Sequence, residues 1–212
     1  MQSEQTNGPS IFSTQAKLIL ASASPRRRKL LDNLGLIFSV EVADIEERPR
    51  AHETPQQFVL RAATEKAHAI SRHHPDGWAL GADTVVVFDN RILGKPVDAG
   101  DAMRMLTLLA GKWHEVLTGF CLCIEDNPNL TARVVTTAVK FMDFDNAIAT
   151  GYVQTGEPLD KAGAYGIQGM GGFLVERING SYSNVVGLPL AEVLAALLEQ
   201  GIIVPASGSV LK

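Results

Sequence analysis

The chain has 212 residues, with 19 Lys or Arg against 23 Asp or Glu, so its formal net charge is −4. Apolar residues make up 46% of the sequence, which excludes an intrinsically disordered chain, and 19 glycines and 10 prolines exclude a collagen-like or low-complexity one. The acidic balance argues against nucleic-acid binding driven by net charge. A chain of this length can bury one sizeable core, as one domain or two closely packed lobes.

The ends of the chain and its two cysteines bear on location. Residues 1–15 lack a basic stretch followed by an apolar core, and no apolar run approaches the ~18 residues of a membrane span. Cys121 and Cys123 lie two positions apart, which is poor geometry for a mutual disulfide and typical of small apolar residues in a reducing compartment. We expect a cytoplasmic protein without a membrane segment, with a flexible N-terminal tail over 1–16 and a C-terminal tail over 205–212.

The first half of the chain alternates apolar segments with capped helices. A buried strand is predicted over 17–23, followed by a helix that Ser24 caps and that ends near Asn33. A second strand is predicted over 36–42. The pair Thr54 and Gln57 forms a capping-box pattern that opens a long helix to about Arg72. An apolar strand, a turn and a short returning strand are then predicted over 78–88, 89–90 and 91–93.

The second half mixes strands and helices without a strict alternation. The predicted elements are a helix over 101–110, a strand pair over 116–125 and 131–141, a helix capped by Asp143 that ends near Thr155, a strand over 173–178 and an amphipathic helix over 188–198. This order predicts an α/β fold with a mixed sheet.

Four consecutive cations, Arg26 to Lys29, occupy the first turns of the helix that follows Ser22 and Ser24. A helix N-terminus carries partial positive charge and prefers anions, so the cations are unfavourable there unless an anion is bound. Backbone N–H groups, hydroxyls and arginine forks together would favour a phosphate. The alternative is a solvated basic turn, or long side chains that cover the core.

Two carboxylates stand out in their segments. Glu47 ends the acidic run DIEE, which is usual in a solvated loop but would hold Mg²⁺ if it faced a phosphate site. Asp83 is the one carboxylate of the apolar strand GADTVVVF, so it must reach a cleft, pair with a cation or bind a metal. After the turn, the chain brings Lys95 back towards this strand.

Lys66 and a glycine-dense segment complete the candidates. Lys66 falls within the apolar stripe of the long helix, so it needs an anionic partner or a route to solvent for its ammonium. The segment 163–172 allows close backbone approach to a ligand, and the amide of Gln168 would complement a base edge; a flexible loop is the alternative. No Ser–His–Asp set is visible, which disfavours covalent catalysis.

Six segments, in this order, resemble the Maf family of nucleoside triphosphate pyrophosphatases: LILASASPRRRKLL, DIEE, TEK, GADTVVVFDNRILGKP, EPLDKAGAYGIQGMGG and NGSYSNVVGLPL. The resemblance covers about 17–200. It implies one catalytic domain over 17–204, with a mixed twisted sheet, flanking helices and two lobes around a deep cleft, similar to the inosine-triphosphate pyrophosphatase architecture. It also implies hydrolysis of a nucleoside triphosphate to the monophosphate and pyrophosphate, a divalent cation (Mg²⁺, Mn²⁺ or Co²⁺) as cofactor, and a homodimer.

The resemblance also implies residue roles. Asp83 matches the catalytic base, Glu47 a carboxylate important for activity, and Lys66 and Lys95 the active-site lysines; Glu47 and Asp83 would hold the metal. The phosphate-binding element matches Ser22, Ser24, Arg26 and Arg27. The specificity positions match Arg26, Thr84 and Gln168, which is the pattern of the branch that acts on dTTP and UTP rather than on 7-methyl-GTP.

Two other functions stay open at this point. The cleft would also suit a nucleotide sensor or a regulator of septum formation that does not turn its ligand over. A nucleic-acid binder that uses the basic turn predicts steeply salt-dependent affinity. The net charge of −4 and the lack of an aromatic stacking platform weigh against nucleic acid as a partner.

Overall fold

The computed structural model describes residues 10–125 and 131–206, and its main feature is a seven-stranded sheet. Six strands follow the order β3–β2–β4–β6–β7–β8, and β5 pairs beside β4. The bounds are β2 (Leu18–Ala21), β3 (Ser39–Val40), β4 (Trp78–Phe88), β5 (Arg91–Leu93), β6 (Trp113–Cys123), β7 (Thr131–Phe141) and β8 (Val175–Asn179). The strand β2 pairs in parallel with β3 and β4, and the other neighbours are antiparallel. This mixed sheet with flanking helices confirms the predicted fold class.

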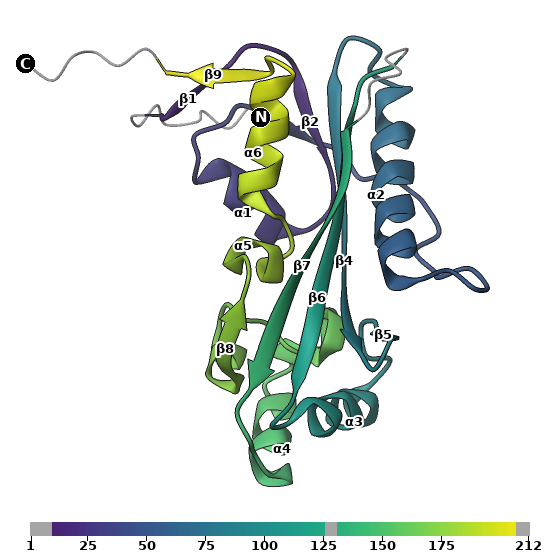
Figure 1. The fold of residues 1–212 in the computed structure, drawn as a ribbon, viewed down its shortest axis with the longest axis vertical. Helices are drawn as coiled ribbons and strands as arrows, with labels where there is room; N and C mark the ends of the chain where they lie inside the picture. Colours follow the sequence, from purple (N-terminus) through teal and green to yellow (C-terminus); the bar gives the residue numbers. More distant parts are fainter. Residues whose placement is uncertain (1–9, 126–130, 207–212) are drawn as a thin grey trace, which may run out of the picture.

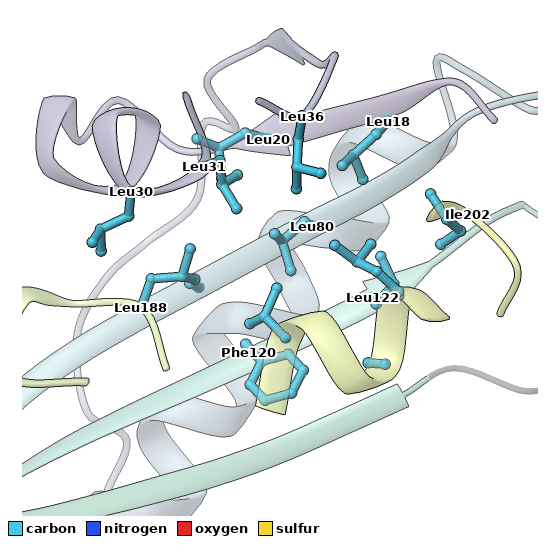
Figure 2. Packing of buried hydrophobic residues seen from close by; sticks show 14 of the residues in the cluster. Leu18, Leu20, Leu30, Leu31, Leu36, Leu80, Phe120, Leu122, Leu188 and Ile202 are labelled. Carbon is cyan, nitrogen blue, oxygen red and sulfur yellow. The ribbon is translucent and has the colours of Figure 1, made fainter. Parts of the chain in front are cut away.

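The long strands β4, β6 and β7 carry two lobes at their opposite ends (Figure 1). At one end, α1 (Pro25–Asp32) and α6 (Leu190–Glu199) pack on an apolar cluster that includes Leu80 and Phe120 (Figure 2). At the other end, α3 (Ala99–Leu109) and α4 (Asn146–Gln154) pack on a cluster that includes Val86 and Val116. Both clusters take residues from β4 and β6, so the same two strands join the lobes.

The helix α2 (Pro55–Ser71) covers the other face of the sheet (Figure 1). Two glycines let it lie unusually close. A Cβ on Gly81 would stand 2.2 Å from the carbonyl oxygen of Ala63, and one on Gly119 would stand 2.3 Å from that of Val59. Since Asp83 pairs with Gly119 across β4 and β6, the helix passes directly over the strand position that carries the carboxylate.

Most predicted elements are present, with local differences at their ends. Ser24 and Thr54 cap their helices as predicted, and β4, β5 and β7 have the predicted bounds. The helix predicted from residue 101 begins at Ala99 because Asp98 accepts a hydrogen bond from the backbone N–H of Asp101. Asp145, and not Asp143, caps α4, because its carboxylate accepts from the N–H groups of Ala147 and Ile148.

Other differences concern short elements. The strand predicted over 36–42 is reduced to β3, and the one predicted from 173 starts at Val175, because a 3₁₀ turn, η3 (Met170–Leu174), precedes it. The helix predicted over 188–198 is α6, which starts at Leu190, and the short helix α5 (Tyr182–Val186) was not predicted. Two further 3₁₀ turns, η1 (Glu157–Asp160) and η2 (Ala162–Ala164), lie in the second half of the chain.

The two ends of the described chain meet. The strand β1 (Phe12–Thr14) pairs antiparallel with β9 (Ile203–Pro205), and the N–H of Ala206 donates to the carbonyl of Ile11. Residues 12–14 therefore belong to a sheet, and the prediction that they lie in a flexible tail is wrong. Pro205, the first residue of the predicted C-terminal tail, is the last residue of β9, and residues 1–9 and 207–212 of the two tails lie outside the described residues.

Two predictions about the environment can be compared with the structure. Within 10–125 and 131–206, no helix has the length and apolar character needed to cross a membrane. Cys121 and Cys123 are both buried and are not joined in a disulfide, as their spacing predicts.

Candidate active site

A cavity of about 580 Å³ opens at one edge of β4. Along this edge, β2 pairs with β4 from Trp78 to Gly81, and β5 pairs with it from Val86 to Phe88. Within the described residues, positions 82–85 between these two pairings have no partner strand on that side. Adjacent residues of a strand point to opposite faces, so Asp83 and Thr84 enter the cavity from the two faces of the sheet.

All ten residues singled out in the sequence line this one cavity: Ser22, Ser24, Arg26, Arg27, Glu47, Lys66, Asp83, Thr84, Lys95 and Gln168. They come from α1 and the turn before it, the segment before α2, α2, β4, the segment after β5, and the glycine-rich segment. Ser22, Arg27, Lys66 and Asp83 are buried, whereas Glu47, Lys95 and Gln168 are exposed at the rim.

Lys66 joins the two carboxylates. Its Nζ lies 2.7 Å from Oδ1 of Asp83 and 2.7 Å from Oε1 of Glu47. Lys66 is 6% exposed and Asp83 is 7% exposed, so the ion pair between them is shielded from water. The carboxylate of Asp83 thereby supplies a partner for an ammonium that lies buried on the apolar face of α2. Lys66 also donates to the carbonyl of Ala82 on β4, at 3.4 Å. Of the two alternatives predicted for Lys66, an anionic partner or a route to solvent, the structure shows anionic partners, which are the two candidate carboxylates.

The protonation of Glu47 reflects this neighbourhood. Partial burial by itself would raise the pKa of its carboxyl group. The hydrogen bond and charge of Lys66, followed by the charges of Lys95 and Arg27, outweigh that effect and hold the pKa below its ordinary value. Glu47 is therefore a carboxylate at neutral pH, the form that binds a cation.

The donor set fits the divalent cation that the resemblance implies. Glu47 and Asp83 both contact one ammonium nitrogen, so their carboxylates are near enough to share a cation. Mg²⁺ and Mn²⁺ prefer such hard oxygen ligands, and Mg²⁺ is commonly held by one or two carboxylates together with substrate phosphates. In the described part of the chain, no group of three or more His, Cys, Asp or Glu side chains could hold a metal.

Arg27 links three parts of the cavity wall. Its Nε donates to the carbonyl of Gly187 at 2.8 Å, and its Nη2 donates to Oγ1 of Thr84 at 3.0 Å. Its Nη1 donates to Oγ of Ser22 at 3.0 Å and to the carbonyl of Ala82 at 2.9 Å. Four of its five N–H groups therefore contact protein, and the guanidinium fixes the walls while its charge stays beside the cavity. Burial lowers its pKa, an effect that the charges of Asp83 and Glu47 partly offset.

Thr84 lies on the face of the sheet that Arg27 contacts. Its hydroxyl lies 2.9 Å from that of Thr118 and also contacts the carbonyl of Gly187, at 3.3 Å. Arg26, the other arginine of the helix start that lines the cavity, reaches across the cavity mouth, where its Nη1 lies 3.5 Å from Oδ2 of Asp160. The basic turn thus contacts both lobes.

The sequence reasoning missed a second group of residues that shapes the segment around Glu47. Arg61 donates to both carboxylate oxygens of Glu53, at 2.6 and 2.9 Å, and to the carbonyl of Arg48 at 2.9 Å. Arg61 also pairs with Glu65 one turn along α2. The spacing of Arg61 and Glu65 in the sequence is a signal for that pair, but nothing local points to the contact with Glu53.

Comparison with known proteins supports one family. The sequence model of the family described as Maf-like protein matches residues 17–200. A protein of Desulfotalea psychrophila named dTTP/UTP pyrophosphatase is 50% identical over 193 residues, which cover 91% of this chain and 99% of that protein. A Myxococcus xanthus protein of the same name is 50% identical over 191 residues, with coverage of 90% and 96%.

A solved structure agrees on the fold. The Staphylococcus aureus Ham1 protein superposes with a TM-score of 0.51 at 12% sequence identity, covering 87% of this chain and 99% of that one. At this identity the similarity concerns the fold alone. The family match spans most of the chain, and these relatives share half of their residues with it, so the chain belongs to the Maf-like protein family.

Proposed function

We propose that this chain hydrolyses dTTP and UTP to the nucleoside monophosphate and pyrophosphate. One observation carries the proposal: ten residues chosen from the sequence line a single cavity. The chain that holds them is half identical to proteins named dTTP/UTP pyrophosphatase.

In this proposal Asp83 directs water to the α-phosphorus. Lys66 bonds Oδ1 of Asp83, while Oδ2 has no hydrogen-bond partner among the described residues. That free oxygen accepts a hydrogen bond from the attacking water and takes its proton as a general base. Attack at the α-phosphorus releases pyrophosphate as the leaving group, so both products follow from one displacement.

Glu47 and Asp83 would hold a divalent cation, Mg²⁺, Mn²⁺ or Co²⁺, together with triphosphate oxygens. When bound, the cation polarises the phosphoryl group and neutralises developing charge. Lys66 keeps the two carboxylates close together in the described structure, and its ammonium would be free to contact a phosphate oxygen when a cation is held.

The cationic side chains would stabilise the pyrophosphate leaving group. Ser22, Ser24 and Arg26 lie at the start of α1, where the helix N-terminus adds partial positive charge. Lys95 faces them from the segment after β5. Arg27 contributes its charge from beneath the cavity, and its hydrogen bonds to Ser22 and Thr84 hold these hydroxyls in place.

Arg26, Thr84 and Gln168 would select the base. The amide of Gln168 donates and accepts, so it complements part of the edge that uracil and thymine share. A 5-methyl group needs only a small apolar space, so discrimination between dTTP and UTP is expected to be worth only ~1 kcal/mol.

The proposal is tested by incubating the protein and Mg²⁺ with a panel of nucleoside triphosphates and measuring pyrophosphate, monophosphate and orthophosphate. Hydrolysis of dTTP and UTP above the other nucleotides is expected. Asp83→Asn should lower kcat by about 10²–10⁴-fold, the range for loss of a general base. Asp76→Asn, which breaks an exposed ion pair with Lys17, is the matched control and should leave turnover unchanged.

Three outcomes would contradict this proposal. Release of orthophosphate places the cleavage elsewhere, and near-normal turnover in Asp83→Asn removes that residue from its role. Tight binding of triphosphates without hydrolysis favours the sensor or septum-regulator function.

We also propose a homodimer in a cytoplasmic location, with a nucleoside triphosphate as its ligand and neither nucleic acid nor membrane as partner. The buried, free cysteines suit a reducing compartment. Light scattering of the pure protein and salt titration of any DNA or RNA affinity test the dimer and the absence of nucleic-acid binding.

A further inference from the structure

The glycine-rich segment borders the cavity without a long helix or strand of its own. Its 3₁₀ turns η2 and η3 flank residues 165–169, of which Tyr165, Gly166, Ile167 and Gln168 line the cavity. The side chain of Gln168 is exposed and has no hydrogen bond to the described residues. Its position is therefore set by the backbone on either side of it.

Two side chains outside the cavity hold that backbone. Oε2 of Glu157 accepts from the N–H of Met170 at 3.0 Å, and Oε1 accepts from the N–H of Gly171 at 3.0 Å. The hydroxyl of Tyr152 donates to Oε1 of Glu157 at 2.9 Å and accepts from the N–H of Gly166 at 3.3 Å. The pair thus contacts the backbone on both sides of Ile167 and Gln168.

The glycines are shaped to these two side chains. A Cβ on Gly171 would stand 2.2 Å from the Tyr152 hydroxyl oxygen, and one on Gly169 would stand 2.8 Å from Oε2 of Glu157. Gly169 also has a φ of 85°, which disfavours any larger residue. The glycine-rich composition therefore serves close backbone packing on Glu157 and Tyr152, in addition to any approach to the ligand.

The contact of Glu157 and Tyr152 with the glycine-rich backbone is rigid because it is both charged and buried. Tyr152 is 3% exposed and packs edge to face on Phe173, with ring centroids 6.1 Å apart. Hydrogen bonds from backbone N–H groups to an ionised carboxylate are among the stronger ones in proteins. Neither residue lines the cavity in which we propose that the nucleotide binds.

We propose that Glu157 and Tyr152 form a backbone clamp that positions Gln168 and so sets the pyrimidine selectivity of the site. Both are positioning residues rather than catalytic ones. The proposal rests on the proposed function for the identity of the base, but the clamp itself concerns which base is preferred and not whether the phosphate is cleaved.

The test compares Tyr152→Phe and Glu157→Gln with the wild type, using kcat/KM for dTTP, UTP and CTP. Tyr152→Phe removes only the hydroxyl, and it should lower kcat/KM for dTTP and UTP about 2–10-fold, through KM, with little change for CTP. Glu157→Gln replaces an acceptor by an amide N–H and should lower it about 10-fold or more. Tyr182→Phe makes the same change at an exposed tyrosine and should leave all three values unchanged.

A double-mutant cycle separates the clamp from a general loss of stability. If the clamp acts through Gln168, Tyr152→Phe should add little to the selectivity loss that Gln168→Ala already causes. Equal losses for all three nucleotides, or fully additive losses with Gln168→Ala, would overturn the proposal. If Glu157→Gln does not fold, Tyr152→Phe carries the test alone.

A binding measurement keeps the clamp distinct from the proposed function. Dissociation constants for α,β-imido analogues of dTTP and CTP do not require turnover. If the wild type does not hydrolyse dTTP but Tyr152→Phe narrows the ratio of these constants, the proposed function fails and the clamp stands. If the wild type prefers neither analogue, or the variant keeps its ratio, the clamp is overturned.

Discussion

Two irregular segments flank the cavity, residues 41–53 and the glycine-rich segment 163–172, and they are held by different kinds of contact. Residues 41–53, which carry Glu47, contact α2 through charged side chains. Arg61 of α2 donates hydrogen bonds to the carboxylate of Glu53 and to the carbonyl of Arg48. The glycine-rich segment is held by Glu157 and Tyr152, whose carboxylate and hydroxyl accept hydrogen bonds from its backbone N–H groups. The backbone next to Gln168 is thus fixed at the main chain, whereas the position of Glu47 depends largely on pairs of long side chains.

This difference matches the tasks that we propose for the two segments. If Glu47 and Asp83 hold a cation as proposed, they would exchange their lysine partner for it, and contacts through side chains would leave room for that adjustment. Base selection needs an amide at a constant distance, and fixed main-chain contacts supply it. Variants on the Glu47 side should therefore change turnover, and variants on the Gln168 side should change selectivity between bases.

The largest expected effect is on the carboxylate side. Glu47→Gln removes the charge that pairs with Lys66 and that would bind the cation, so kcat should fall about 10²–10³-fold. The preference for dTTP over CTP should stay as in the wild type, because Gln168 lies on the other segment. Steady-state kinetics with both nucleotides checks this, and a fall in selectivity as large as the fall in kcat would contradict the separation.

Acid should act on the two sides at different pH. Burial lowers the pKa of His114, which bonds the hydroxyl of Tyr165 in the glycine-rich segment, from 6.5 to about 4. In the unfolded chain the His114 imidazole takes up a proton near pH 6.5, whereas in the folded protein it does so only near pH 4. The contribution of the neutral imidazole to the free energy of unfolding is therefore complete above pH 6.5 and is lost as the pH falls. The loss by pH 4 amounts to roughly 3 kcal/mol.

The opposite side responds at lower pH. The hydrogen bond from Arg61 outweighs desolvation and lowers the pKa of Glu53 from 4.5 to about 2. The contribution of the Glu53 carboxylate to stability is therefore complete above pH 4.5 and is lost as the pH falls towards 2.

Urea unfolding between pH 7.5 and 4 measures the loss of stability that is assigned to His114. His114→Gln should flatten the dependence, and His52→Asn, at an exposed site, should not. If the free energy of unfolding of His114→Gln falls with pH as steeply as that of the wild type, His114 is not the source of this pH dependence.

A pair of glycine variants tests the clamp side by crowding. Gly171→Ala places a methyl group on the Tyr152 hydroxyl, so it should cost about 1–3 kcal/mol of stability and reduce the preference for dTTP. Gly151→Ala adds the same methyl group to α4, where nothing lies within 4 Å of it. That control should gain about 0.5–1 kcal/mol, because alanine favours helix more than glycine does. Thermal unfolding and the nucleotide panel give both readouts.

The smallest effect is expected at the side-chain tether. Arg61→Gln leaves Glu53 without its main partner and should lower the free energy of unfolding by about 1–2 kcal/mol, with a moderate fall in kcat at constant selectivity. Arg104→Gln breaks an exposed ion pair with Asp101 on α3 and should cost less than about 0.5 kcal/mol. If both variants behave alike in denaturant titration and kinetics, Arg61 does not tether the segment of Glu47.

Local signals in the sequence determined much of this protein. A cap such as Ser24 or Thr54 acts on N–H groups within three residues, so its position predicts where α1 and α2 begin. The continuous apolar run of β4 predicts a buried strand, and the lone carboxylate in it predicts that Asp83 reaches a cleft, pairs with a cation or binds a metal. The family resemblance then supplied roles for residues that periodicity alone left open.

The tertiary structure decided which faces meet. Lys66 and Asp83 come together because Gly81 and Gly119 let α2 lie close on the sheet, and Arg27 reaches Gly187 from the far end of the chain. The gap on β4 between β2 and β5, which opens the cavity, depends on two separate strand pairings. A periodic pattern specifies the face that a residue takes on its own helix or strand, but non-local contacts depend on how the elements pack. For this reason the Glu157–Tyr152 clamp and the β1–β9 pairing could be recognised only in the folded protein.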